Sequence, residues 1–415
     1  MFEQRLPYGL WDADQHFAEP ERAIPDYIDP RFRSSEKIAV DVVRRERDRI
    51  QAAAKKAGKT DDEIWKDDDI RRIDDGVIVP GTTLNKLNPW KDLSAAEREA
   101  RIAEFREISD ASSTVDGRLS VMDAQGVEGA LLFPQREGLI VHDCFPDDVE
   151  ATYANVRAFN RFTAAEWGFA YKERIFIPAV ISFLDVDLAV KELEQVIADG
   201  ARTVLLPPGP INRQSPADPK FDPFWARAQE AGMNVAVHLN YTEYQQQSAM
   251  WSENPDAHFT QHPGFTAFQW FSYWGDRPVM ELSAALIFHN FFTRFPNIRV
   301  CVSEQGSVWV NYAVRKMDHG FMLGRPATFG ERLPARPSDI FREHFVVAPF
   351  PEESVNRTLE VLSIDQLVFG SDFPHAEGLD DPSKYIVTIA ALSEVDQKKM
   401  MRDNMADFLL GHPID

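Results

Sequence analysis

The sequence predicts an α/β fold, a distorted (β/α)8 TIM barrel with a long helical N-terminal arm and an aromatic-rich insertion. Short apolar segments alternate with helical segments of roughly ten to twenty residues, which is the pattern of a parallel sheet. Counting the first strand, about eight strand candidates emerge, as a closed barrel requires. Barrels with insertions commonly reach the length of this chain, 415 residues, so we expect one domain over 1–415.

The expected elements follow one another in a regular order. The first strand carries Asp14 and His16, and the alternation of helices and strands begins after residue 113. Helices are expected at 115–125, 147–166, 185–198 and 224–231, and further strands at 128–134, 175–180, 203–208, 235–238, 286–289, 300–304 and 367–371.

Two segments interrupt the alternation. Residues 21–115 are rich in charge and proline and contain helical runs at 38–57 and 94–108, so we expect an arm or subdomain laid over the barrel. Residues 241–280 are rich in aromatic side chains, which favours core or an oligomer interface, with a substrate lid as the alternative. Because the arm is too long for a simple loop, we expect a homo-oligomer or a hetero-oligomer with a related subunit.

Composition limits the classes of function. A net charge of -21 and the lack of a basic stripe oppose nucleic-acid binding. No apolar stretch approaches the length of a membrane span, and the N-terminus does not read as a signal peptide. Cys144 and Cys301 form no CxxC pair and no disulfide framework. We therefore expect a cytoplasmic enzyme that acts on a small molecule, with no nucleic acid or membrane partner.

Three strand ends each offer a ligand for a divalent cation. Asp14 and His16 alternate with period two, so they point to the same side of the first strand. His238 ends an apolar strand, and Asp372 follows the last strand candidate. Because barrel enzymes place catalytic groups at the C-terminal ends of their strands, these residues predict a metal site. For Glu19 the sequence supports two interpretations equally, a metal ligand and a salt-bridged loop residue.

Further candidates lie beside these ligands. His289 follows an apolar run, and we place it in the site as a group that moves a proton. Glu304 ends the strand at 300–304 and either orients a ligand or serves as a helix N-terminal carboxylate. His375 either contacts substrate or holds Asp372 through a hydrogen bond. Asp372 itself is expected to bind the metal and to act as a general base, with turn capping as the structural alternative.

Several passages together resemble one known family. They are Asp14–Pro20 (DQHFAEP), Phe292–Trp309 (FTRFPNIRVCVSEQGSVW), Phe369–His375 (FGSDFPH) and Asp403–Ala406 (DNMA). With these passages in this order, the chain resembles the amidohydrolase-related family, in the branch that includes aminocarboxymuconate semialdehyde decarboxylase and the resorcylate-type decarboxylases.

The resemblance implies a set of site residues. The family's metal ligands carry over to His16, His238 and Asp372. Asp14 stands where the family commonly has the first histidine of a His-x-His pair, and Glu19 follows as in an acidic Asp-x-His-x-x-Glu sub-branch.

The resemblance also bears on catalysis and on the number of metals. His289 matches the position of the decarboxylases' catalytic histidine. The superfamily's bridging lysine would lie in 203–208, where this chain has no lysine. A second metal would therefore need another bridge, such as Glu19.

Three functions follow as hypotheses. The first is a metal-dependent hydrolase or non-oxidative decarboxylase of a small carboxylate or ring substrate, with zinc as the expected ion and iron or manganese as alternatives. The second is an oxygenase or hydroxylase with two iron ions or a mixed metal pair on the same fold. The third is a non-catalytic partner subunit of an active paralogue.

Overall fold

The computed structural model describes most of the chain outside the arm and the insertion. The described residues are 6–33, 37–39, 93–135, 137–239, 250–251, 277–324, 329, 332–375 and 378–411. The expected helix at 38–57 and the aromatic insertion at 241–280 therefore lie almost entirely outside the described residues.

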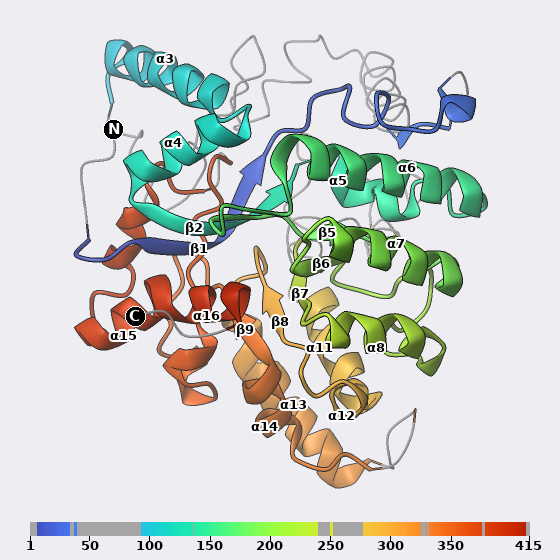
Figure 1. The fold of residues 1–415 in the computed structure, drawn as a ribbon. Helices are drawn as coiled ribbons and strands as arrows, with labels where there is room; N and C mark the ends of the chain where they lie inside the picture. The colour runs from blue at the N-terminus through green and yellow to red at the C-terminus, as the bar shows by residue number, and fades with distance from the viewer. Residues whose placement is uncertain are drawn as a thin grey trace.

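Two sheets form the centre of the molecule (Figure 1). One has the order β1-β2-β4-β3 and the other the order β5-β6-β7-β8-β9, and every pair is parallel except β3 with β4. The strands are β1 (Leu10–Phe17), β2 (Val127–Pro134), β3 (Ala170–Tyr171), β4 (Ile175–Phe176), β5 (Ala179–Val180), β6 (Thr203–Leu206), β7 (Asn234–Val237), β8 (Val300–Val302) and β9 (Phe345–Val347).

The two sheets together make a distorted barrel of the TIM type. On one side, β4 runs into β5 with two residues between them. On the other side, the segment 367–373 lies between β9 and β1. The Val368 amide donates to the Val347 carbonyl at 3.0 Å, and the His16 amide donates to the Phe373 carbonyl at 2.8 Å. The expected strand at 367–371 is therefore present as a bridging segment, with isolated bridges at Leu367 and Phe373 in place of a regular ladder.

Helices cover the outside of the sheets (Figure 1). Side-chain caps begin several of them: Thr114 accepts from the Gly117 amide, Asp148 from the Ala151 amide and Asp185 from the Leu188 amide. The helices are α3 (Ala95–Ala111), α4 (Val115–Gln125), α5 (Glu137–Ile140), α6 (Val149–Phe162), α7 (Val186–Ala198), α8 (Asp222–Glu230), α11 (Arg277–Phe288), α12 (Phe291–Arg294), α13 (Val308–Leu323), α14 (Pro337–His344), α15 (Glu394–Lys398) and α16 (Asn404–Leu410).

One expected strand is wrong, and two short strands, β3 and β9, were missed. Residues 286–289 are not a strand, because 277–288 form the helix α11. A run of a few apolar residues has the same appearance in a buried strand and on the buried face of a helix, so periodicity does not separate them. The strand β9 is three residues long and follows α14 directly, so no turn signal in the sequence separates the helix from the strand.

The described ends of the arm pack on the barrel's helices. Next to α6, the Tyr27 hydroxyl donates to Glu166 at 2.8 Å, and the Asn155 side chain accepts from the Ala39 amide at 2.8 Å. At the other end, Phe105 of α3 packs with Val121 of α4 and with Phe373. The arm therefore reaches the residue that follows Asp372.

None of the described helices combines the length and the apolar character that crossing a bilayer requires.

Candidate metal centre

An irregularity in β1 aims its acidic and imidazole side chains into the barrel. Asp12 pairs with Ala130 and Gln15 with Leu132, so three steps along β1 face two along β2. A bulge of this kind re-aims side chains and is frequent beside active sites. Asp14 is 3% exposed and His16 is fully buried, so both candidate ligands lie inside the protein.

Five side chains from four segments converge at this point. His16 Nε2 lies 3.2 Å from His238 Nε2 and 3.4 Å from Asp14 Oδ1. Glu304, two residues after β8, places Oε2 at 2.8 Å from His238 Nε2. Asp372 contacts the same atom of His16, with Oδ1 at 3.2 Å from Nε2.

The donor atoms suit a divalent cation. Among the described residues, Asp14, His16, His238 and Glu304 form one group whose ligand atoms all lie within 4.8 Å of one another. A second group shares His16 and Glu304 and adds Asp372 and His375. Buried carboxylates and imidazoles in one place are the ligands that manganese, iron and zinc accept.

Hydrogen bonding supports the same conclusion. His238 Nδ1 lies 2.7 Å from the Leu239 carbonyl, which fixes the proton on Nδ1 and leaves the Nε2 lone pair toward the cluster. Asp14 Oδ1 is buried and has no hydrogen-bond donor in the described part of the chain. A buried carboxylate oxygen without a donor is costly, and a bound cation would remove this cost. The residues present therefore fit a divalent metal ion.

The electrostatics of the metal-free cluster show how strongly it attracts positive charge. Burial alone lowers the pKa of His238, but the carboxylates of Glu304 and Asp14 outweigh it and raise that pKa to about 9. Burial likewise lowers the pKa of His16, yet Asp14, Asp372 and Glu304 hold it well above the usual value. A cation bound here would replace the positive charge that these protons supply.

One carboxyl in the cluster has a raised pKa. Burial, together with the charge of Glu304, raises the pKa of Asp372 well above its usual value. The pKa of Glu304 moves the other way, because His238 and His16 outweigh its burial and lower it. Environments that separate the pKa values of neighbouring carboxyls are typical of acid and base pairs in active sites.

The backbone is strained where two of these carboxyls sit. Glu304 has a φ of 51° and Asp372 a φ of 54°, in the left-handed region that non-glycine residues rarely adopt. Gly370 approaches β1 so closely that a Cβ there would lie 2.8 Å from the Cβ of Asp14. Strain of this kind costs energy and persists where a site requires the geometry.

The remaining expected site residues divide into two groups. His375 is beside the cluster: its Nδ1 lies 2.7 Å from Asp372 Oδ1, and its ring centroid lies 3.9 Å from that of His16. Glu304 belongs to the cluster itself, although the sequence left it undecided between a ligand-orienting residue and a helix N-terminal carboxylate. The helix that follows Glu304, α13, begins four residues later at Val308, so Glu304 does not lie in the first turn of that helix.

Two other expected site residues lie apart from the cluster. Glu19 accepts hydrogen bonds from the amides of Gln135 and Gly138, at 3.0 and 3.1 Å, and so binds the loop after β2. His289 follows α11, and its Nδ1 lies 2.8 Å from Ser215 Oγ. Neither belongs to the metal-capable groups of the described residues. A second metal bridged by Glu19, which the sequence left open, therefore finds no support in these groups.

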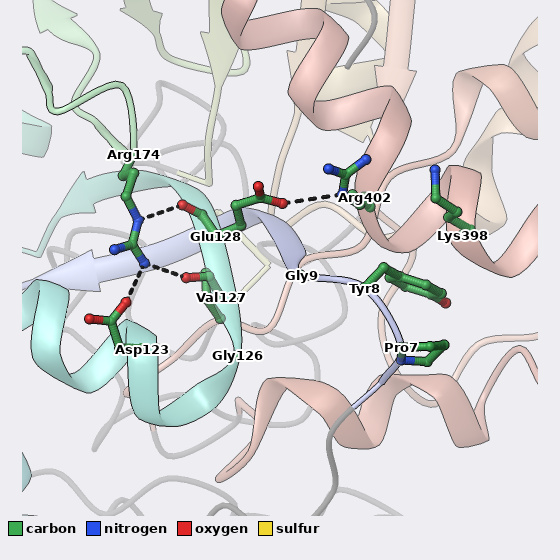
Figure 2. Close-up of a pocket in the computed structure, with 10 residues that line it drawn as sticks. All are labelled: Pro7, Tyr8, Gly9, Asp123, Gly126, Val127, Glu128, Arg174, Lys398 and Arg402. Atoms are coloured by element: carbon green, nitrogen blue, oxygen red, sulfur yellow. Dashed lines mark hydrogen bonds and ion pairs between the residues drawn. The ribbon is translucent and has the colours of Figure 1, made fainter. Parts of the chain in front are cut away.

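A groove on the protein lies at the opposite end of β1 (Figure 2). Its lining includes Gly9, just before β1, and Arg174, Lys398 and Arg402. Arg174 pairs with Asp123 at 2.8 Å and Arg402 with Glu128 at 3.1 Å. From Gly9 to the end of β1 is roughly 20 Å at the rise of a strand, so the groove and the cluster are separate.

The family follows from a comparison over nearly the whole chain. Residues 11–409 match the model of the amidohydrolase family known as Amidohydro_2. The chain belongs to this family. The amidohydrolase assignment explains why ligands gather at the C-terminal ends of the strands, and it makes the protein an enzyme of the hydrolase or lyase type in a metal-dependent superfamily.

Individual relatives are similar to this amidohydrolase to different extents. A 2-amino-3-carboxymuconate-6-semialdehyde decarboxylase from Dictyostelium discoideum is 25% identical over 126 residues, which cover 30% of this chain and 34% of that relative. The crystal structure of an amidohydrolase from Mycobacterium avium subsp. paratuberculosis is 26% identical, with 98% of both chains covered and a TM-score of 0.74.

A third relative contains a metal. A dihydroxybenzoic acid decarboxylase from a Polaromonas species, with bound manganese and the inhibitor 2-nitroresorcinol, is 16% identical, with 98% of both chains covered and a TM-score of 0.57. At this identity the likeness concerns the fold.

Proposed function

We propose that this amidohydrolase is a manganese-dependent, non-oxidative decarboxylase of a small carboxylate attached to a ring or a conjugated chain. The observation that carries the proposal is the cluster of the buried Asp14, His16, His238 and Glu304 with the half-buried Asp372, which combines cation ligands with a carboxyl of raised pKa. The decarboxylase names of several relatives support the choice of reaction.

The cluster supplies what decarboxylation requires. When the bond between the carboxylate and the adjoining carbon breaks, carbon dioxide leaves and that carbon must receive a proton. Asp372 is the carboxyl whose pKa is raised, and we assign it as the donor. His375 Nδ1, 2.7 Å from Asp372 Oδ1, orients that carboxyl.

The choice of manganese rests on the donor set. A divalent cation bound by Asp14, His16 and His238 would supply a Lewis acid that holds and polarises substrate oxygens. Carboxylate oxygens make up a large part of the cluster, and a carboxylate-rich set with imidazoles suits manganese at least as well as zinc. The manganese of the Polaromonas relative supports the same choice.

Deuterium labelling tests the proposed reaction. We expect the manganese-loaded enzyme to release carbon dioxide from one member of a panel of hydroxybenzoates and unsaturated dicarboxylates. In heavy water the product should carry one deuterium at the carbon that lost the carboxylate, as read by mass spectrometry. Treatment with a chelator should abolish the activity, and added manganese should restore it.

Matched assays separate this proposal from hydrolysis. A panel of esters, amides and lactones should be turned over poorly by the same preparation. Cleavage of one of these with no release of carbon dioxide from any carboxylate would replace the decarboxylase with a hydrolase on the same residues.

A further inference from the structure

A buried carboxylate that is not a candidate ligand, Asp12 of β1, hydrogen-bonds to both β1 and the segment 367–373, and each of these carries candidate ligands. Asp12 is fully buried, two residues before Asp14 on the same strand. Its Oδ1 accepts from the Asp14 amide at 3.0 Å and from the Ser371 amide at 2.9 Å. Its Oδ2 accepts from Ser371 Oγ at 2.6 Å and from Gln15 Nε2 at 3.0 Å.

The first of these bonds holds the bulge in β1. Because three steps along β1 face two along β2, the chain between Asp12 and Gln15 leaves the regular ladder. The Asp14 amide binds the Asp12 carboxylate, which provides an acceptor within β1 itself. The carboxylate thus fixes the residue whose side chain enters the cluster.

The bonds to Ser371 fix the second segment. Ser371 lies 359 residues away in the sequence and directly precedes Asp372. Ser371 Oγ also accepts from the Phe373 amide at 3.2 Å, and the Asp372 amide donates to the Asp14 carbonyl at 2.8 Å. These contacts surround Asp372, whose φ of 54° needs support from its neighbours.

We infer that Asp12 is a positioning residue that sets the distance between the Asp14–His16 pair and Asp372, and so tunes the affinity of the cation site. This inference rests on the proposed metal-dependent function. Asp12 contributes no donor to either metal-capable group, so its effect passes through Asp14 and Ser371. Residues that orient ligands typically change metal affinity by roughly 10- to 100-fold when they are replaced.

Two substitutions at Asp12 separate its shape from its charge. Asp12→Ala removes all four acceptor contacts. Asp12→Asn keeps an oxygen that accepts from the Asp14 and Ser371 amides. If the Gln15 side-chain amide flips, the new Asn NH2 group can donate to Gln15 Oε1. Gln15 Oε1 is buried and has no hydrogen-bond partner among the described residues, so it is ready to accept this bond. We expect Asn to rescue most of what Ala loses.

The experiment measures manganese affinity of the full-length, folded protein by titration calorimetry, with thermal unfolding of the metal-free protein as the measure of stability. Asp12→Ala should weaken manganese binding by roughly 10- to 100-fold, Ser371→Ala less, and Asp12→Asn by no more than a few fold. Tyr153→Phe is the matched control, because Tyr153 on α6 donates a buried hydrogen bond to the Ser182 carbonyl and neither residue belongs to a metal-capable group. It should lower the unfolding temperature and leave manganese affinity unchanged.

The outcomes distinguish the two ideas. If the parent binds manganese and Asp12→Ala binds it equally well, or loses only what Tyr153→Phe loses, the positioning role is overturned and the proposed function stands. If the parent binds no divalent cation, the metal-dependent function is overturned, and the inference about Asp12 with it.

Discussion

Both ends of the barrel carry acidic and basic side chains, but these are paired near the surface at one end and buried at the other. In the groove near Gly9, basic and acidic side chains form ion pairs at the surface. Lys398 Nζ, for example, lies 2.7 Å from Asp403 Oδ1, and both side chains are partly exposed. At the other end, Asp14, His16 and His238 are buried, and Asp14 Oδ1 has no donor among the described residues. A charged cluster is therefore a candidate for function when burial leaves its charges incompletely compensated, and a candidate for stability when its charges are paired near water.

The largest effect is expected at the cluster. His238→Ala removes a buried imidazole that lies 2.8 Å from Glu304 and 3.2 Å from His16. We expect manganese affinity to fall by more than roughly 100-fold and decarboxylation to be lost, because a ligand and the geometry it imposes disappear together. Elemental analysis of the folded variant measures the first effect. Unchanged metal stoichiometry would remove His238 from the ligand set.

Manganese affinity at the buried cluster should depend on pH. The pKa of His238 is about 9 in the metal-free protein, since Glu304 and Asp14 outweigh the burial that would lower it. A cation binds the neutral imidazole, so it competes with a proton at every pH below this value. Manganese affinity should rise with pH up to about 9, by roughly tenfold per pH unit for each proton displaced. A flat profile between pH 6 and 9 would count against imidazole ligation.

The pH dependence of the unfolding free energy should depend on Glu353, which binds the turn after Glu304. Its Oε2 accepts from the Ser307 amide at 2.7 Å, and burial raises its pKa from 4.5 to about 7 against the opposing effect of Ser307. Between these values the folded protein holds a proton that the unfolded chain releases, so Glu353 makes folding less favourable as pH rises through this window.

The variant Glu353→Gln tests this assignment. It keeps an acceptor for Ser307 but has no proton to lose. Relative to the parent, it should gain stability from pH 5 to pH 7, on the order of 2 kcal/mol, as measured by denaturant unfolding at each pH. An equal pH dependence in the two proteins would contradict the raised pKa.

His289 offers a smaller effect that tests its position. Because it lies at the end of α11 and contacts Ser215 Oγ, we expect His289→Gln to change kcat/KM by less than about tenfold. A loss comparable to that of His238→Ala would restore His289 to the catalytic site, as its sequence position suggested.

The smallest effect is expected in the groove. Lys398→Ala removes an ion pair with Asp403 between partly exposed side chains, which should cost less than about 1 kcal/mol of unfolding free energy and leave metal affinity unchanged. A large change in manganese binding would show that the two ends of the barrel are coupled.

The sequence by itself determined the barrel and most of the cluster. Apolar strands alternating with helices allow little besides a parallel α/β fold, and the C-terminal ends of parallel strands meet at one end of a barrel. Period two placed Asp14 and His16 on one face, and strand ends marked His238 and Asp372. These features are local, so a single sequence carries them.

Only the tertiary structure decided which other residues reach the cluster. Glu304 reaches the cluster at a residue with a positive φ, Glu19 accepts hydrogen bonds from amides of the loop after β2, and His289 follows a helix where the sequence predicted a strand. Asp12 gains its role from a bulge and from bonds to Ser371, 359 residues away. Periodicity records which face a side chain occupies along its own element. The distances between elements depend on bulges, strained backbone and long-range hydrogen bonds, which form only when the whole chain has folded.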